Sequence, residues 1–122
     1  MSIAISNNTK LDVPMNIQRN KELPLKLKLR IPNTNPKQYY NLTAHKFKMK
    51  IIDADGNQKY LFDNNRFGVD SDFQRTLLIT SDETEAFDPQ EKYYYDLHVI
   101  YPDLKKDYWT HGRIYIADRI TT

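Results

Sequence analysis

Three histidines are the side chains of this sequence best suited to acid–base chemistry or metal binding. His45, His98 and His111 each lie in or beside a segment with strand periodicity, and none has the histidine four residues away that a zinc-binding helix requires. We therefore expect surface or structural roles for them. A serine nucleophile is not indicated either, because no serine stands in a G-x-S-x-G turn. The serines are Ser2, Ser6, Ser71 and Ser81.

Two oxygen-rich stretches have the side chains that a hard cation prefers. Asp53, Asp55 and Asn57 surround Gly56 as in a calcium loop, but the EF-hand spacing of glycine and glutamate is not met. The Asp-Gly pair instead predicts a tight hairpin turn. We interpret the second stretch as a solvated loop. Its oxygen-bearing residues are Asp63, Asn64, Asn65, Asp70, Ser71 and Asp72.

Composition removes several other kinds of site. The chain has 122 residues and no cysteine, which excludes disulfides, thiol nucleophiles and cysteine-bound metals. Its glycines, Gly56, Gly68 and Gly112, are too few and too scattered for a phosphate-binding loop. Residues 1–12 lack the features of a signal peptide, and no apolar run approaches the ~20 residues that span a bilayer. We expect a protein made in a cytoplasm, not an enzyme, with no cofactor, no metal and no membrane contact.

The elements that must position these side chains are predicted to be strands. Leu23 to Ile31 has aliphatic residues at every odd position, and His45 to Ile52 alternates apolar residues with lysines. Such alternation predicts strands with one buried face. Their outer faces are basic and carry Lys26, Lys28 and Arg30 in the first strand and Lys46, Lys48 and Lys50 in the second.

Much of the remaining chain shows the same period of two. We predict a helical turn over residues 81–87, capped by Ser81, and a β-bulge near Gly112, where the apolar positions change parity. About seven short strands separated by turns indicate an all-β sandwich or barrel. The further strands are predicted over Val13 to Gln18, Gln58 to Phe62, Arg75 to Thr80, Glu91 to Tyr101 and Tyr108 to Ala117.

The net charge of +2 conceals two oppositely charged halves. Residues 1–62 hold eleven Lys and Arg against four Asp and Glu, a balance of +7, whereas residues 63–122 hold seven against twelve, a balance of −5. Such a distribution can orient a protein on charged partners.

The basic strands allow two interpretations. If they are neighbours in one sheet of a small barrel, their lysines form a single patch that could bind single-stranded nucleic acid. In an immunoglobulin-like fold the two strands belong to different sheets, and the lysines keep the outer faces soluble and block edge pairing. We favour the second interpretation, because most tyrosines share the parity of core residues.

The C-terminal third resembles a known family. Residues 91–99 (EKYYYDLHV), the loop at Pro102 and Asp103, residues 111–116 (HGRIYI) and residues 120–122 (ITT) are similar to the ending of small immunoglobulin-like virion proteins of tailed bacteriophages. The N-terminal domain of baseplate upper proteins is the type that they resemble. The resemblance implies an immunoglobulin-like antiparallel β-sandwich of about seven strands with one short helical turn.

The opening of the same family pattern matches residues 16–20, the strand from Leu23 and residues 40–43. Lys92 and Asn20 depart from glycines in the pattern, and no extension follows that would form a stalk or a receptor-binding head. The resemblance therefore implies the docking module alone.

We divide the chain into a flexible N-terminal arm, residues 1–12, and a sandwich domain, residues 13–122. The arm has no periodicity but carries apolar residues that could become ordered against a neighbouring subunit. Together with the basic faces these give the predicted interaction residues, which are Ile3, Ile5, Leu11, Lys26, Lys28, Arg30, Lys46, Lys48 and Lys50.

The function that we predict is that of a bacteriophage structural protein located in the virion. It would dock onto capsid, neck or tail proteins, or onto copies of itself, as a capsid decoration or a head–tail or baseplate accessory; nucleic acid is not the expected partner. The alternatives are a barrel that binds single-stranded nucleic acid and a carbohydrate-binding module for the host surface. The latter would use exposed Trp109 and Tyr108 beside Asp107.

Overall fold

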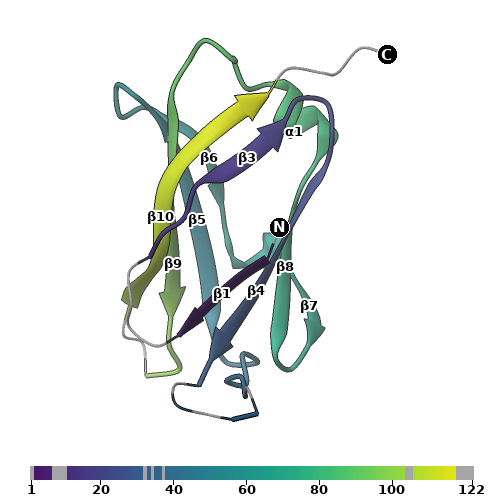
Figure 1. Cartoon of the computed structure of the whole chain (residues 1–122), viewed down its shortest axis with the longest axis vertical. Helices are drawn as coiled ribbons and strands as arrows, with labels where there is room; N and C mark the ends of the chain where they lie inside the picture. The colour runs from purple at the N-terminus through teal and green to yellow at the C-terminus, as the bar shows by residue number, and fades with distance from the viewer. Residues whose placement is uncertain are drawn as a thin grey trace.

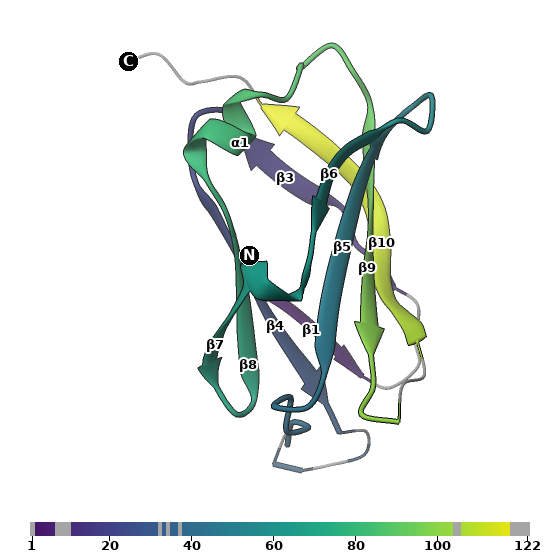
Figure 2. The same ribbon diagram turned by 180° about the vertical axis from the view of Figure 1, so that it is seen from behind.

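The computed structural model describes residues 2–6, 11–31, 33, 35–36, 38–103 and 106–117. These residues form two β-sheets that face each other, as Figures 1 and 2 show from opposite sides. The four-stranded sheet has the order β1 (Ser2–Ser6), β4 (Leu23–Arg30), β8 (Gln74–Ile79) and β7 (Phe67–Ser71). The six-stranded sheet has the order β2 (Leu11–Asp12), β10 (Lys106–Ala117), β9 (Tyr93–Ile100), β5 (Lys46–Asp53) and β6 (Gln58–Phe62), and β3 (Met15–Gln18) also pairs with β10.

The alternation predicted an all-β sandwich or barrel, and the family resemblance implied an immunoglobulin-like sandwich; the structure is such a sandwich. Most neighbouring strands are antiparallel, whereas β1 runs parallel to β4, and β2 and β3 run parallel to β10. The N-terminal segment therefore adds an edge to both sheets. The sequence predicted a flexible arm over residues 1–12; the structure instead places residues 2–6 in β1 and residues 11–12 in β2.

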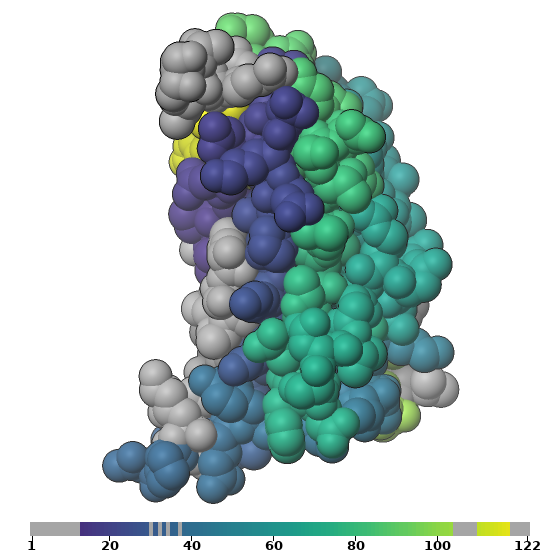
Figure 3. Space-filling model, turned by 90° about the vertical axis from the view of Figure 1, so that its right-hand side faces the viewer, coloured from purple at the N-terminus to yellow at the C-terminus, as the bar shows by residue number. Residues whose placement is uncertain are grey.

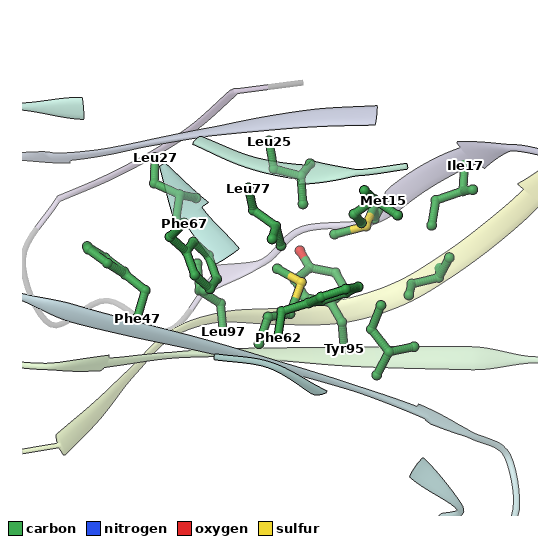
Figure 4. Packing of buried hydrophobic residues seen from close by; sticks show 14 of the residues in the cluster. Met15, Ile17, Leu25, Leu27, Phe47, Phe62, Phe67, Leu77, Tyr95 and Leu97 are labelled. Carbon is green, nitrogen blue, oxygen red and sulfur yellow. The ribbon is translucent and has the colours of Figure 1, made fainter. Parts of the chain in front are cut away.

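The core lies between the sheets and consists of the alternate residues that the sequence marks as apolar. In Figure 4, Leu27 and Leu77 of the four-stranded sheet lie across from Phe47 and Leu97 of the six-stranded sheet. All four are buried, and a side chain of this size contributes about 1.5–3 kcal/mol when it leaves water. The lysines between these positions in β5 remain exposed.

The β5–β6 hairpin has the predicted turn. Gly56 has a φ of +86°, which glycine adopts without strain. The Asp53 carboxylate accepts hydrogen bonds from the backbone N–H groups of Asp55 and Asn57, both at 2.9 Å. The carboxylate that suggested a calcium ligand is thus used to hold the turn.

The predicted helical turn is α1 (Ser81–Glu85), but its N-cap is Thr80 rather than Ser81. The Thr80 hydroxyl accepts a hydrogen bond from the Glu83 N–H at 3.2 Å, and the Glu83 carboxylate accepts one from the Thr80 N–H at 2.9 Å. This reciprocal capping box needs a hydroxyl residue three positions before a glutamate, a spacing that Ser81 does not have.

Helix α1 closes the upper end of the sandwich in Figure 1 and links its two sheets. The buried Thr84 hydroxyl accepts a hydrogen bond from the Lys21 N–H at 3.1 Å and donates one to the Lys21 carbonyl at 2.9 Å, next to β4. On the other side, the Tyr60 hydroxyl of β6 donates to the Glu83 carbonyl at 2.9 Å.

Two further features differ from the sequence prediction. Strand β7 lies in a stretch that we interpreted as loop; only its first residue, Phe67, is buried, so no alternation marks it. The β-bulge lies between Tyr108 and Thr110, before the predicted position at Gly112. The extra residue there moves the even positions of β10 to the inner face, and Ile114 is accordingly buried.

Candidate interaction surfaces

The two lysine-bearing strands belong to different sheets and carry their charges on opposite faces of the molecule. Lys26 of β4 is exposed on the four-stranded sheet, and Lys46, Lys48 and Lys50 of β5 are exposed on the six-stranded sheet. The single patch required by the barrel interpretation therefore does not form. The side chain of Arg30, the third basic residue of β4, lies outside the described residues.

The predicted residues of the arm are placed by backbone register only. Ile3 and Ile5 are in register with two buried leucines of β4, and Leu11 is in register with Thr110 of β10. Their side chains lie outside the described residues, so their contact with a neighbour stays a prediction. The same holds for the side chains of the carbohydrate alternative, Asp107, Tyr108 and Trp109.

On the outer face of the four-stranded sheet, lysine and carboxylate charges lie close together. Figure 3 looks onto the side of the molecule where β4 runs beside β8 and β7. The Asp70 carboxylate accepts hydrogen bonds from the Thr76 hydroxyl and from the Gln74 amide, the latter at 2.8 Å. These bonds lower the pKa of Asp70, and the positive charge of Lys26 lowers it further. Lys26 therefore has an anionic neighbour within its own chain.

The other described lysine of this face, Lys28, is half-buried and also has an internal contact. Its ammonium nitrogen lies 5.0 Å from the centroid of the Tyr39 ring, within the range of a cation–π interaction. Both residues line a shallow depression of about 500 Å³ with Gln38, Ser71, Phe73 and Gln74.

On the outer face of the six-stranded sheet, positive charge predominates along β5. Lys48 is in register with His98 of β9, and Lys50 with Asp96. Among the described residues, Lys46, Lys48 and Lys50 form no ion pair, Asp96 included. This row of positive charge is therefore open to solvent and to a partner.

A depression of about 350 Å³ lies on this face between β5, β6 and β9. Its apolar lining comes from Leu61, which is 38% exposed, and from Ile100. Lys48, Lys50 and His98 line it as well. The arrangement combines an apolar surface with cationic side chains around it.

A second depression of about 480 Å³ lies farther along the same face, where β2 gives way to β3 beside β10. Tyr94 and Tyr115 line it and are 40% and 47% exposed. The Arg113 guanidinium lies 4.7 Å from the centroid of the Tyr115 ring. Asp96 and His111, in register on β9 and β10, complete its polar lining. The sequence analysis did not single out these aromatic residues, although their parity in the strands marks them as outward.

Arg75 is a polar residue of the inner face that the sequence analysis missed. It is only 5% exposed, and its guanidinium carbon lies 5.2 Å from the Phe47 ring centroid. The guanidinium donates to the carbonyls of Phe67 at 2.6 Å, His45 at 3.3 Å and Asn64 at 3.3 Å. Burial lowers the pKa of Arg75. The parity of β8, in which Leu77 and Ile79 are also buried, could have identified it.

The histidines do not join a group of side chains that could hold a metal ion in the part of the chain that the structure describes. His45 precedes β5, and burial lowers its pKa. His98 and His111 lie on β9 and β10. The oxygen-rich stretch from Asp63 is likewise divided: the Asn64 side chain accepts hydrogen bonds from the Phe47 N–H and from Arg75, and other members belong to β7.

Two solved structures are similar to this chain. The structure of the N-terminal domain of phage TP901-1 ORF48 matches with a TM-score of 0.52 and 6% sequence identity, over 94% of this chain and 95% of that one. The structure of murine CRIg matches with a TM-score of 0.44 and 11% identity, over 85% of this chain and 92% of that one.

No protein-family model matches the sequence, and no curated protein matches it either. At such low identity, the likeness to the phage domain shows the fold. Separately, none of the helices described is long and apolar enough to span a membrane.

Proposed function

We propose that this chain is a non-enzymatic structural protein of a bacteriophage virion that docks onto neighbouring capsid or tail proteins. The observation that carries the proposal is the likeness to the N-terminal domain of phage TP901-1 ORF48, which extends over nearly all of both chains. The resemblance of residues 91–99 and 111–116 to phage virion proteins supports it from the sequence side.

The surfaces are consistent with docking. The outer face of the six-stranded sheet presents lysines that form no ion pair among the described residues, together with exposed tyrosines, and aromatic residues are enriched in protein interfaces. Charged faces of this kind steer and orient association. The partners would be capsid, neck or tail proteins, or copies of the same chain, and the place of action would be the virion, after synthesis in the host cytoplasm.

A host-surface carbohydrate-binding module is the second candidate, and one observation favours it. Exposed Tyr94 and Tyr115 lie beside Asp96 and Arg113 in the 480 Å³ depression, which combines aromatic surface with hydrogen-bonding groups. Saccharide titrations followed by NMR would support this candidate if they shift the amide signals of Tyr94 and Tyr115, and would remove it if a panel of host-wall sugars shifts neither.

The experiment that tests the first candidate is mass spectrometry of purified particles. Phage from a strain that encodes this chain is banded twice in a density gradient, and the chain is quantified against the major capsid protein, with an abundant host protein as the control for carry-over. A stoichiometric, reproducible ratio is the expected result. If the chain is no more abundant than the host protein, the proposed function is wrong.

A further inference from the structure

We infer that the outer face of the six-stranded sheet is the docking surface, and that the 350 Å³ depression receives an apolar side chain of a partner protein flanked by carboxylates. The inference rests on the proposed function and deepens it, because it selects one of the two lysine faces and states the chemistry of the partner.

The selection of the face follows from charge. On the four-stranded sheet, Lys26 has Asp70 as an anionic neighbour, and Lys28 lies over the Tyr39 ring. On the six-stranded sheet, Lys48 and Lys50 have no ion-pair partner among the described residues. Asp96 stands opposite Lys50 on this face, but the lining of the 350 Å³ depression has two lysines and no carboxylate, whereas that of the 500 Å³ depression has one lysine. The 350 Å³ depression therefore attracts a negative surface and rejects a positive one.

The chemistry of the partner follows from the lining of the depression. Leu61 and Ile100 leave apolar surface partly exposed, and Lys48, Lys50 and His98 lie around it. An apolar side chain that enters gains by leaving water, and carboxylates beside it meet the lysines. The volume of about 350 Å³ lies near the lower limit of ligand sites, which suits one or two side chains better than an extended ligand.

A nucleic acid fits this face less well. Binding of a single strand needs basic residues along the backbone path and aromatic rings on which bases stack. Here Asp96 is in register with Lys50 and lies two residues from Tyr94 on β9. A nucleic-acid strand that ran from the lysines to the Tyr94 ring would therefore bring its phosphates next to the Asp96 carboxylate. Among the side chains that the structure describes, the exposed tyrosines of this face, Tyr94 and Tyr115, lie in the other depression.

The test compares matched variants on the two faces. K48E/K50E reverses two charges at the depression, and K26E/K28E reverses two on the opposite sheet. Each variant is supplied in trans to a phage whose own copy is deleted, and its amount in purified particles is measured relative to wild type. We expect a loss of at least about tenfold for K48E/K50E and less than about twofold for K26E/K28E. Far-UV circular dichroism and thermal unfolding of the purified variants establish that both are folded.

A second pair removes apolar surface without a change of charge. L61S alters the lining of the depression, whereas L78S alters a leucine of similar exposure on the other sheet, 41% against 38%. Incorporation should fall several-fold for L61S and stay near wild type for L78S. If both variants at the depression enter particles normally, or if those on the opposite face are lost equally, the docking surface is wrongly assigned.

The remaining outcomes are also distinct. If wild-type protein is absent from particles, the proposed function itself fails. If wild-type protein binds a ten-nucleotide oligothymidine in 50 mM salt and K48E/K50E does not, the face binds nucleic acid and the inference is overturned.

Discussion

Arg75 brings a positive charge to the inner face of the sandwich and satisfies it with backbone carbonyls. Replacement by methionine, Arg75→Met, keeps much of the apolar contact with Phe47 but leaves the carbonyls of Phe67, His45 and Asn64 without this donor. We expect the free energy of unfolding to fall by about 3 kcal/mol, as for other buried charged hydrogen-bond donors. Urea denaturation measures it. The exposed Arg113→Met serves as the control and should change stability by less than about 0.5 kcal/mol.

The ion pair between Glu83 and Arg66 should make the free energy of unfolding depend on pH. The Arg66 guanidinium donates to both of its carboxylate oxygens, at 2.9 Å and 2.6 Å, and this bond is the largest cause that lowers the pKa of Glu83. Because the folded state lowers this pKa below the value of about 4.3 in an unfolded chain, the stabilisation is complete above that pH. It is lost as the pH falls through the folded pKa.

The variant Arg66→Gln should therefore be less stable than wild type at neutral pH, and the difference in free energy of unfolding should shrink below about pH 4. The pKa of Glu83, followed by NMR, should rise in the variant. A stability difference that is the same at pH 7 and pH 2 would contradict the assignment and attribute the effect to the other contacts of Arg66, such as its hydrogen bond to the Leu78 carbonyl.

At the scale of elements, the β5–β6 hairpin and strand β7 offer a matched pair of glycines. Gly56→Ala puts a side chain at a φ of +86° and should cost about 1 kcal/mol, although nothing lies within 4 Å of the added methyl group. Gly68→Ala has no such strain, and its methyl group would lie 3.6 Å from the Thr76 carbonyl oxygen, an ordinary contact. It should be neutral or slightly stabilising. Thermal unfolding of both variants tests the contrast; equal losses would mean that backbone strain is not the cause.

The elements that alternation predicted are those with one fully buried face. Strands β4, β5 and β9 bury every second residue against the opposite sheet, so their sequences repeat with a period of two. Strands β1 and β7 are edges, and β7 buries only Phe67. The pairing of β7 therefore depends on the neighbouring backbone of β8 rather than on a pattern of its own. The cap of α1 was visible as threonine and glutamate at the right spacing, but the adjacent Ser81 has the same chemistry.

The candidate surface was predictable only in part, because it also depends on residues that are distant in the sequence. The outward direction of Lys26 and Lys48 follows from strand parity. That Lys26 has a carboxylate nearby depends on Asp70 in β7, which reaches the neighbourhood of β4 across β8. Tertiary neighbours of this kind leave no local trace in a single sequence.

At the scale of the whole molecule, one core joins both sheets, and hydrogen bonds of α1 and of Arg75 link them as well. We therefore expect the sheets to unfold in a single transition. The fluorescence of the only tryptophan, in β10, and far-UV circular dichroism should give the same urea midpoint, with or without reductant since the chain has no cysteine. Separate midpoints would mean that one sheet is stable without the other.

The parallel pairing of β3 with β10 has a mechanical consequence. The chain enters β3 from one end of the sheet and leaves β10 at the other, so tension on the two termini pulls these strands in opposite directions along their own axes. Once β1 has been drawn from β4, the hydrogen bonds that β2 and β3 form with β10 carry the load together, in shear, and are not peeled apart one at a time. The fold is therefore built to resist extension through its ends.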